Sequence, residues 1–217
     1  MIDLFLQGGP FMWPILILFI LGIALSIERL WTLLDASIDT RNFMQKIKVA
    51  LNEKGFEGAM EISSNTKGPV ASLFYAGLMR AKRGIEAVEK AIGSAGTIEM
   101  AFLERNLIWL ATIATIAPLL GFTGTVSGMV NAFQDIAAAD DISPSIVAGG
   151  ISEALLTTLF GLIVAMIIQT THNFFVSRID RLIIDMEESS VELVESLIEL
   201  EEGSLKSQPT ESSPEQL

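Results

Sequence analysis

Two long apolar segments, joined by a short acidic stretch, constrain the fold of this chain more than any other feature. Residues 106–134 contain no charged side chain, and residues 146–176 contain no Lys or Arg and a single acid, Glu153. Because ~20 apolar residues in a helix cross a bilayer, each segment is long enough to span it. The pair Ser143-Pro144 is typical of a helix start. The sequence therefore predicts two membrane helices joined by a loop at residues 135–145.

The N-terminal region supplies another apolar segment. Residues 11–28 are predicted to form the first membrane helix, with Trp13 and Trp31 as anchors at its two interfaces. A cleaved signal peptide is the alternative, but it needs a basic start and a small-residue cleavage site. The pair Glu28-Arg29, which ends the apolar segment, provides neither.

The basic residues are distributed asymmetrically. Of the 14 Lys and Arg residues, 11 lie in residues 29–105, whereas residues 1–10 and the 135–145 loop have none. The positive-inside rule then places the N-terminus and the short loop on the outer side of the membrane and residues 29–105 in the cytoplasm. We expect a multi-pass membrane protein with an outward-facing N-terminus and a cytoplasmic C-terminus.

These observations predict an all-α membrane protein with three transmembrane helices and a large cytoplasmic helical loop. The second and third helices, at residues 106–134 and 146–176, are expected to extend into the cytoplasm. Apolar residues at helical spacing among acids predict that the third helix continues as a cytoplasmic amphipathic helix over residues 177–202. The polar, Pro-containing residues 203–217 predict a disordered tail.

Composition excludes several classes of function. The chain has no cysteine and one histidine, His172, which argues against zinc sites and Ser-His-Asp hydrolases. No nucleotide-binding loop, nucleophile–base set or metal-ligand spacing occurs, so we expect neither an enzyme nor a cofactor. The net charge of -12 argues against nucleic acid as a partner.

Glu153 is the residue with the clearest functional signal. On a helical wheel it shares one face with Thr157, Gly150 and Gly161, all within ~80° of it. An ionisable residue that faces small and polar neighbours in a membrane helix fits a hydrated path. The alternative is a structural carboxylate near the interface, because Glu153 lies only about two turns after Pro144.

The second apolar segment has a comparable face of small residues around Thr125. Small residues at this spacing allow membrane helices to approach closely. The threonine hydroxyls either help to coordinate water or donate to the carbonyl one turn back. The predicted ion-path positions are Thr125, Glu153, Thr157 and Thr158; the predicted helix-shaping and packing positions are Pro118, Gly121, Gly124, Gly128, Gly150 and Gly161.

At these residues the sequence resembles the MotA/TolQ/ExbB proton channel family, and it is most similar to ExbB-type members. The resemblance rests on Glu28-Arg29, on LATIATIAPLLGFTGTVSGMVNAF at residues 110–133, and on GGISEALLTTLFGLIVAMIIQTTHNFF at residues 149–175. It extends more weakly to about residue 200.

The resemblance implies a homopentamer in the lipid of the bacterial inner membrane around two single-span ExbD/TolR-like subunits. The second and third spans would line the lumen, and the outward-facing N-terminus would be periplasmic. The partner would bring a membrane aspartate, and the motor would drive a TonB-like or TolA-like periplasm-spanning protein. By motif, Thr125, Glu153 and Thr158 are the lumen-facing polar positions, and Pro118 and Gly121 shape the second helix.

Two departures from the family's pattern concern the transported ion. Phe122-Thr123 stands where two apolar residues are usual, and His172 replaces a common tyrosine. The proton is the expected ion and sodium the alternative. The implied function is a proton-channel subunit that energises TonB-dependent outer-membrane transport; the alternatives are TolQ-like outer-membrane maintenance and a non-conducting membrane scaffold.

Overall fold

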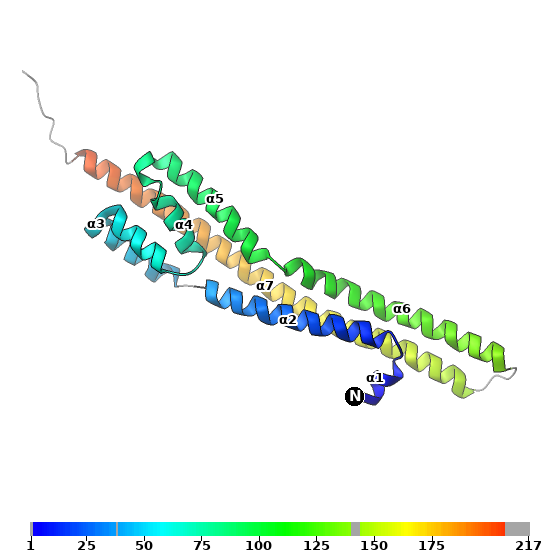
Figure 1. Ribbon diagram of the computed structural model, residues 1–217. Coiled ribbons are helices and arrows are strands. Elements are labelled where there is room, and N and C mark those ends of the chain that lie inside the picture. The colour runs from blue at the N-terminus through cyan, green and yellow to red at the C-terminus, as the bar shows by residue number, and fades with distance from the viewer. Residues whose placement is uncertain (1, 38, 140–143, 207–217) are drawn as a thin grey trace, which may run out of the picture. The chain divides into compact units, whose positions relative to one another are not determined.

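The structure is a computed structural model that describes residues 2–37, 39–139 and 144–206 (Figure 1), and within these ranges it contains helices and no strand. The all-helical prediction is therefore confirmed for the described residues. The helices are α1 (Ile2–Gln7), α2 (Met12–Ala36), α3 (Thr40–Asn65), α4 (Pro69–Leu78), the 3-10 helix η1 (Ala81–Arg83), α5 (Ile85–Glu104), α6 (Leu107–Ala139) and α7 (Pro144–Lys206).

In the part of the chain that the structure describes, three helical stretches are long and apolar enough to cross a membrane, as predicted. They are Met12–Asn65, Ile85–Ala138 and Val147–Leu200. Their apolar parts are the sequences of α2, of α6 and of the first half of α7. The chain is thus a multi-pass membrane protein with three candidate spans.

The helix bounds differ from the sequence prediction at several ends. Residues 1–10 contain the short helix α1, which was not predicted, and α2 and α6 continue beyond residues 28 and 134. Pro144 is the first residue of α7, as its sequence context predicted, and α7 runs without interruption to Lys206. Residues 203–206, predicted as the start of a disordered tail, are the helical end of α7, and the rest of that predicted tail, residues 207–217, lies outside the described residues.

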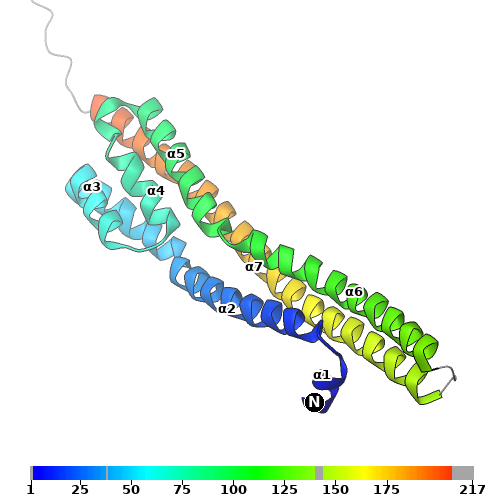
Figure 2. The same cartoon turned by 45° about the vertical axis from the view of Figure 1, so that its right-hand side comes forward.

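The chain divides into two compact units, Met1–Thr32 with Glu104–Arg178, and Leu33–Leu103 with Ile179–Leu217. In the first unit, α6 and α7 run side by side and α2 lies along α7 (Figures 1 and 2). Gly22 of α2 is the point of close approach, because a Cβ there would lie 3.1 Å from Cγ1 of Ile168 on α7 and 3.6 Å from Cγ2 of Ile113 on α6. Ile168 is completely buried. The apolar core of this unit therefore lies where the three helices meet.

The second unit packs α3, α4 and α5 with the C-terminal part of α7. The rings of Phe43 on α3 and Phe74 on α4 lie 5.3 Å apart, and both side chains are buried. Lys48 of α3 forms a 2.5 Å ion pair with Glu192 of α7. Gly55 interrupts α3 with φ +65°, a left-handed conformation that glycine adopts at little cost.

Candidate functional site

Glycines bring α6 and α7 into close contact along a seam in the first unit. A Cβ on Gly121 would lie 2.9 Å from the carbonyl oxygen of Thr157, and one on Gly161 would lie 2.6 Å from the carbonyl oxygen of Ala117. Two turns further along α6 from Gly121, a Cβ on Gly128 would lie 3.2 Å from the carbonyl oxygen of Gly150. The two backbones are thus close enough that only a hydrogen fits at these positions, as in other small-residue membrane interfaces.

Three threonine hydroxyls meet at one backbone carbonyl in this seam. Thr125 of α6 donates to the carbonyl oxygen of Gly121 over 3.1 Å, and Thr158 of α7 reaches the same oxygen over 3.1 Å. The Thr125 and Thr158 hydroxyls also hydrogen-bond to each other across the two helices. The hydroxyl of Thr157 donates to Ala154 O at 2.8 Å and lies 3.4 Å from Gly121 O. We call Thr125, Thr157, Thr158 and the Gly121 carbonyl the hydroxyl cluster.

The members of the hydroxyl cluster differ in their exposure. Thr157 is 1% exposed and packs against Gly124, whose hypothetical Cβ would lie 2.6 Å from the Thr157 hydroxyl oxygen. Thr125 and Thr158 are half-buried. A hydroxyl can donate one hydrogen bond and accept up to two. The hydroxyls of Thr125 and Thr158 can therefore replace their bond to each other with a bond to water. Thr157 is placed for packing inside the seam.

Glu153 lies one turn before Thr157 on α7 and faces a different neighbour. Its half-buried carboxylate packs against Gly9, in the turn between α1 and α2. Within the described residues it forms no hydrogen bond or ion pair with Thr125 or Thr158. The structure therefore brings the three threonines together and leaves Glu153 outside their cluster.

Pro118 lies inside α6 without ending the helix. Proline cannot donate a backbone hydrogen bond, so the carbonyl of Ala114, one turn earlier, lacks the donor that residue 118 would otherwise supply. Ala114 and Ala117, which flank this turn, are buried. Pro118 thus modifies α6 one turn from the Gly121 carbonyl that the threonines share.

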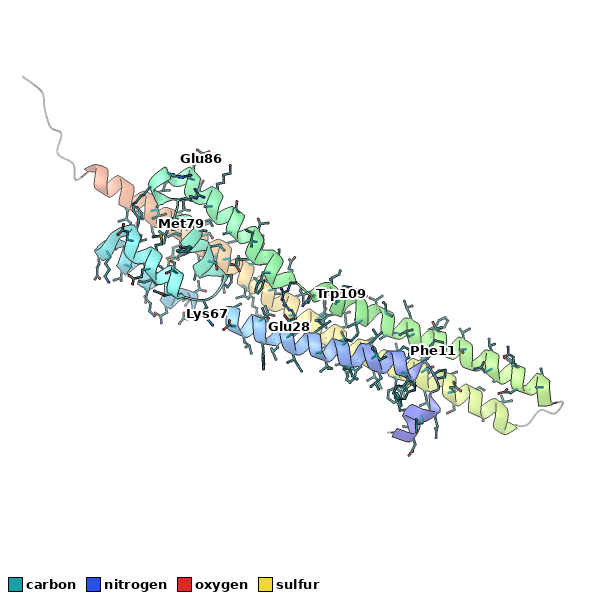
Figure 3. All side chains as sticks on the ribbon, viewed as in Figure 1. Phe11, Glu28, Lys67, Met79, Glu86 and Trp109 are labelled. Atoms are coloured by element: carbon teal, nitrogen blue, oxygen red, sulfur yellow. The ribbon has the colours of Figure 1, made fainter. Side chains whose placement is uncertain are left out.

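A charged cluster lies where α2 and α6 approach each other, at the Glu28-Arg29 pair (Figure 3 labels Glu28). Arg29 is fully buried and donates to the Glu28 carboxylate over 2.8 Å from Nε and 2.6 Å from a terminal nitrogen. The Asn106 amide donates to the same carboxylate at 3.2 Å, and Arg105 lies 3.7 Å from it. Asn106 has φ +66°, which asparagine tolerates better than most residues.

The sequence alone does not predict two of these contacts. The Asn106 amide joins Glu28 across 78 positions of sequence, and the Gly9 backbone lies against Glu153. The local signals were an asparagine at a helix junction and a Gly8-Gly9-Pro10 turn before an apolar segment. Neither signal identifies the distant partner. Among the described residues no group of His, Asp and Glu side chains is arranged to hold a metal ion.

The fold and the seam define a multi-pass helical membrane protein whose second and third apolar helices pack through glycines around shared hydroxyls. The chain belongs to the MotA/TolQ/ExbB proton channel family, which it matches over residues 65–188. The members of this family are proton channels.

Among curated proteins the chain is ExbB-like. It is 29% identical over 180 residues to the putative biopolymer transport protein ExbB homolog of Methanothermobacter thermautotrophicus, an alignment that covers 82% of this chain and 64% of that protein. It is 36% identical over 99 residues to the Tol-Pal system protein TolQ of Pseudomonas aeruginosa, covering 46% of this chain and 43% of that protein. It is 40% identical over 78 residues to the biopolymer transport protein ExbB of Salmonella typhimurium, covering 36% of this chain and 32% of that protein.

Proposed function

We propose that the chain is a proton-channel subunit of an inner-membrane motor that works with a single-span ExbD/TolR-type partner to energise TonB-dependent outer-membrane transport. The observation that carries this proposal is the hydroxyl pair of Thr125 and Thr158, held on two helices by one Gly121 carbonyl. Family membership and the ExbB-like relatives support the same assignment.

In this proposal five copies of the chain surround two partner helices in the membrane, with α6 and α7 lining the lumen. The N-terminus faces the periplasm, and the C-terminal part of α7 lies in the cytoplasm. The distribution of basic residues supports this orientation, because residues 29–105 hold 11 of the 14.

The hydroxyl pair supports the proton path by holding water beside an acidic group of the partner. Each hydroxyl can accept from water while donating to the Gly121 carbonyl or to the other threonine. Glu153 contributes a carboxylate nearer the start of α7, where it adjusts the local field or takes part in transfer. A proton that moves through 100 mV releases ~2.3 kcal/mol, so a few protons supply enough energy for a change in helix packing.

Proton flux in liposomes that contain the chain and its partner tests the role of the hydroxyl pair. Thr158→Val and Thr125→Val keep the side-chain shape and remove the hydroxyl. Leaving a buried polar partner unpaired costs ~1–3 kcal/mol, so we expect flux to fall about fivefold or more in each variant. Unchanged flux in both variants would remove the hydroxyl pair from the path.

Thr115→Val is the matched control for this experiment. Thr115 also lies on α6, but its hydroxyl is exposed and donates only to the carbonyl of Ala111, at 2.9 Å. We expect its flux to match that of the wild-type chain. A loss equal to that of Thr158→Val would show that any lost threonine hydroxyl on these helices reduces flux.

A TolQ-like role in outer-membrane maintenance is the second candidate, favoured by the similarity to TolQ of Pseudomonas aeruginosa. Co-purification of the chain with its single-span partner from the native membrane, followed by identification of the partner, separates the two roles. A non-conducting scaffold predicts a stable partner complex with no proton flux above that of empty liposomes.

A further inference from the structure

The turn between α1 and α2 lies directly against Glu153. Gly9 in this turn has φ +69°, and a Cβ at this position would overlap the Glu153 carboxylate, lying 2.7 Å from its Cδ and 3.2 Å from its Cγ. Because a Cβ essentially never lies within 3.0 Å of a non-bonded heavy atom, a side chain at residue 9 would displace the Glu153 carboxylate. The contact joins two residues that are far apart in sequence, and it exists only because residue 9 has no side chain. We call residues 8–11 the N-terminal elbow.

The N-terminal elbow is held in place on both sides. The ring of Phe5 on α1 meets the ring of Trp13 on α2 edge to face, at 5.3 Å between centroids and 87° between planes. Such aromatic pairs contribute beyond their buried area. Backbone bonds from Gly8 N to Phe5 O and from Met12 N to Gly9 O, both 3.2 Å, close the turn. Met12 is 1% exposed, so the start of α2 is anchored in the core.

We propose that the N-terminal elbow positions Glu153, with Gly9 as the positioning residue. A half-buried glutamate in the apolar part of α7 has several rotamers available. In the present rotamer its carboxylate occupies the space that a side chain at residue 9 would fill. This inference rests on the proposed function, because Glu153 is a wall group of the proton path in that proposal. It adds that the path depends on a segment before the first span.

The contact itself is tested by a disulfide. The chain contains no cysteine, so the variant Gly9→Cys/Glu153→Cys has no competing thiol. A Cβ at residue 9 lies 3.2 Å from Cγ of Glu153, and therefore within reach of a disulfide between the two positions. We expect oxidation to give an intramolecular cross-link in the assembled complex. The control pair is Gly8→Cys/Glu153→Cys, because residue 8 faces Met12. No cross-link with Gly9→Cys, or equal cross-linking of both pairs, would overturn the contact.

The positioning role is tested by proton flux in the reconstituted complex. Gly9→Ala forces the glutamate away from its present rotamer, and we expect flux to fall about two- to twelvefold, the range that follows from the cost of an off-rotamer side chain. Glu153→Asp shortens the side chain by one methylene, which draws the carboxylate back from residue 9 and reduces the overlap. We therefore expect Gly9→Ala to cause no additional loss when Glu153→Asp is present.

Gly55→Ala controls for the backbone conformation of Gly9. Gly55 has φ +65°, close to that of Gly9, but nothing lies within 4 Å of a Cβ placed there. We expect it to leave flux unchanged even where it lowers stability. If Gly9→Ala reduces flux by the same factor with Glu153 and with Glu153→Asp, the elbow does not act through the carboxylate. If the wild-type complex conducts no protons while the cross-link forms, the proposed function fails and the contact stands.

Discussion

Replacing Gly161 by alanine is expected to destabilise the packing of α6 against α7. The added Cβ would lie 2.6 Å from the carbonyl oxygen of Ala117 and 3.2 Å from Cα of Gly121, both of which are backbone atoms. Backbone atoms cannot swing aside as a flexible side chain can, so the helices must separate. Overpacking of this kind costs ~1–3 kcal/mol.

Whether Gly161→Ala lowers or raises the stability also depends on helix propensity. Alanine favours a helix over glycine by ~0.8–1 kcal/mol, so Gly→Ala stabilises a helix wherever space is open. Gly149 provides this control on the same helix, because nothing lies within 4 Å of a Cβ placed there. We expect Gly149→Ala to raise stability by up to ~1 kcal/mol. The net loss for Gly161→Ala is then from close to zero to ~2 kcal/mol, and the two variants should differ by ~1–3 kcal/mol.

Thermal unfolding of the assembled complex in detergent, followed by circular dichroism, measures this difference. Wild type, Gly149→Ala and Gly161→Ala are compared at one protein and detergent concentration, because assembly makes the midpoint depend on concentration. We expect the midpoint temperature to be highest for Gly149→Ala, intermediate for wild type and lowest for Gly161→Ala. If Gly161→Ala is as stable as Gly149→Ala, the backbones of α6 and α7 are not in contact at residue 161. That result would refute the close packing of the two helices through their glycines.

Two further predictions concern the ends of the spans and the second unit. Asn106→Gly keeps the backbone conformation at φ +66° and removes the 3.2 Å hydrogen bond to Glu28. We expect the free energy of unfolding to fall by ~1.5–3 kcal/mol, which is typical of hydrogen bonds to charged groups. Asn106→Ala should lower it further, because alanine tolerates the left-handed backbone at this position less well than glycine. Urea unfolding of both variants separates the cost of the lost hydrogen bond from the cost of the strained backbone. Equal stability of Asn106→Gly and Asn106→Ala would exclude a backbone contribution. Phe74→Ala removes a fully buried ring that packs on Phe43, and a loss of ~3–5 kcal/mol is expected in the same assay; a change below ~1 kcal/mol would contradict a core position for this ring.

The helices and candidate spans could be predicted from the sequence because they depend on local patterns. Long apolar segments identify membrane spans from length alone, and Pro144 marks the start of α7 through its own backbone constraint. The helix α1 was missed because Ile2–Gln7 is too short to show a period. Asn106 was missed because its bond to Glu28 depends on how α2 and α6 meet, which no local pattern specifies.

The helical wheel placed Glu153 and Thr157 on one face, about 40° apart, and the structure shows why that was insufficient. Thr157 is 1% exposed and packs against Gly124 of α6, whereas the Glu153 carboxylate packs against Gly9. A wheel gives the direction of a side chain around its own helix. The neighbour that lies in that direction is determined by tertiary packing. In this chain, Glu153 and Thr157 share a face of α7 but contact different neighbours, Gly9 and Gly124.

This division has a consequence for how α7 works in the proposed channel. Thr158 is tied to α6 through the Gly121 carbonyl, so its position follows the glycine seam. Glu153 is set by the N-terminal elbow, so its position follows the anchoring of α1 and α2. Sites more than ~7–10 Å apart that share no partner usually respond independently to perturbation. A change in the elbow can therefore move the carboxylate while the hydroxyl cluster stays intact, which makes the N-terminal segment a separate point of control over the same path.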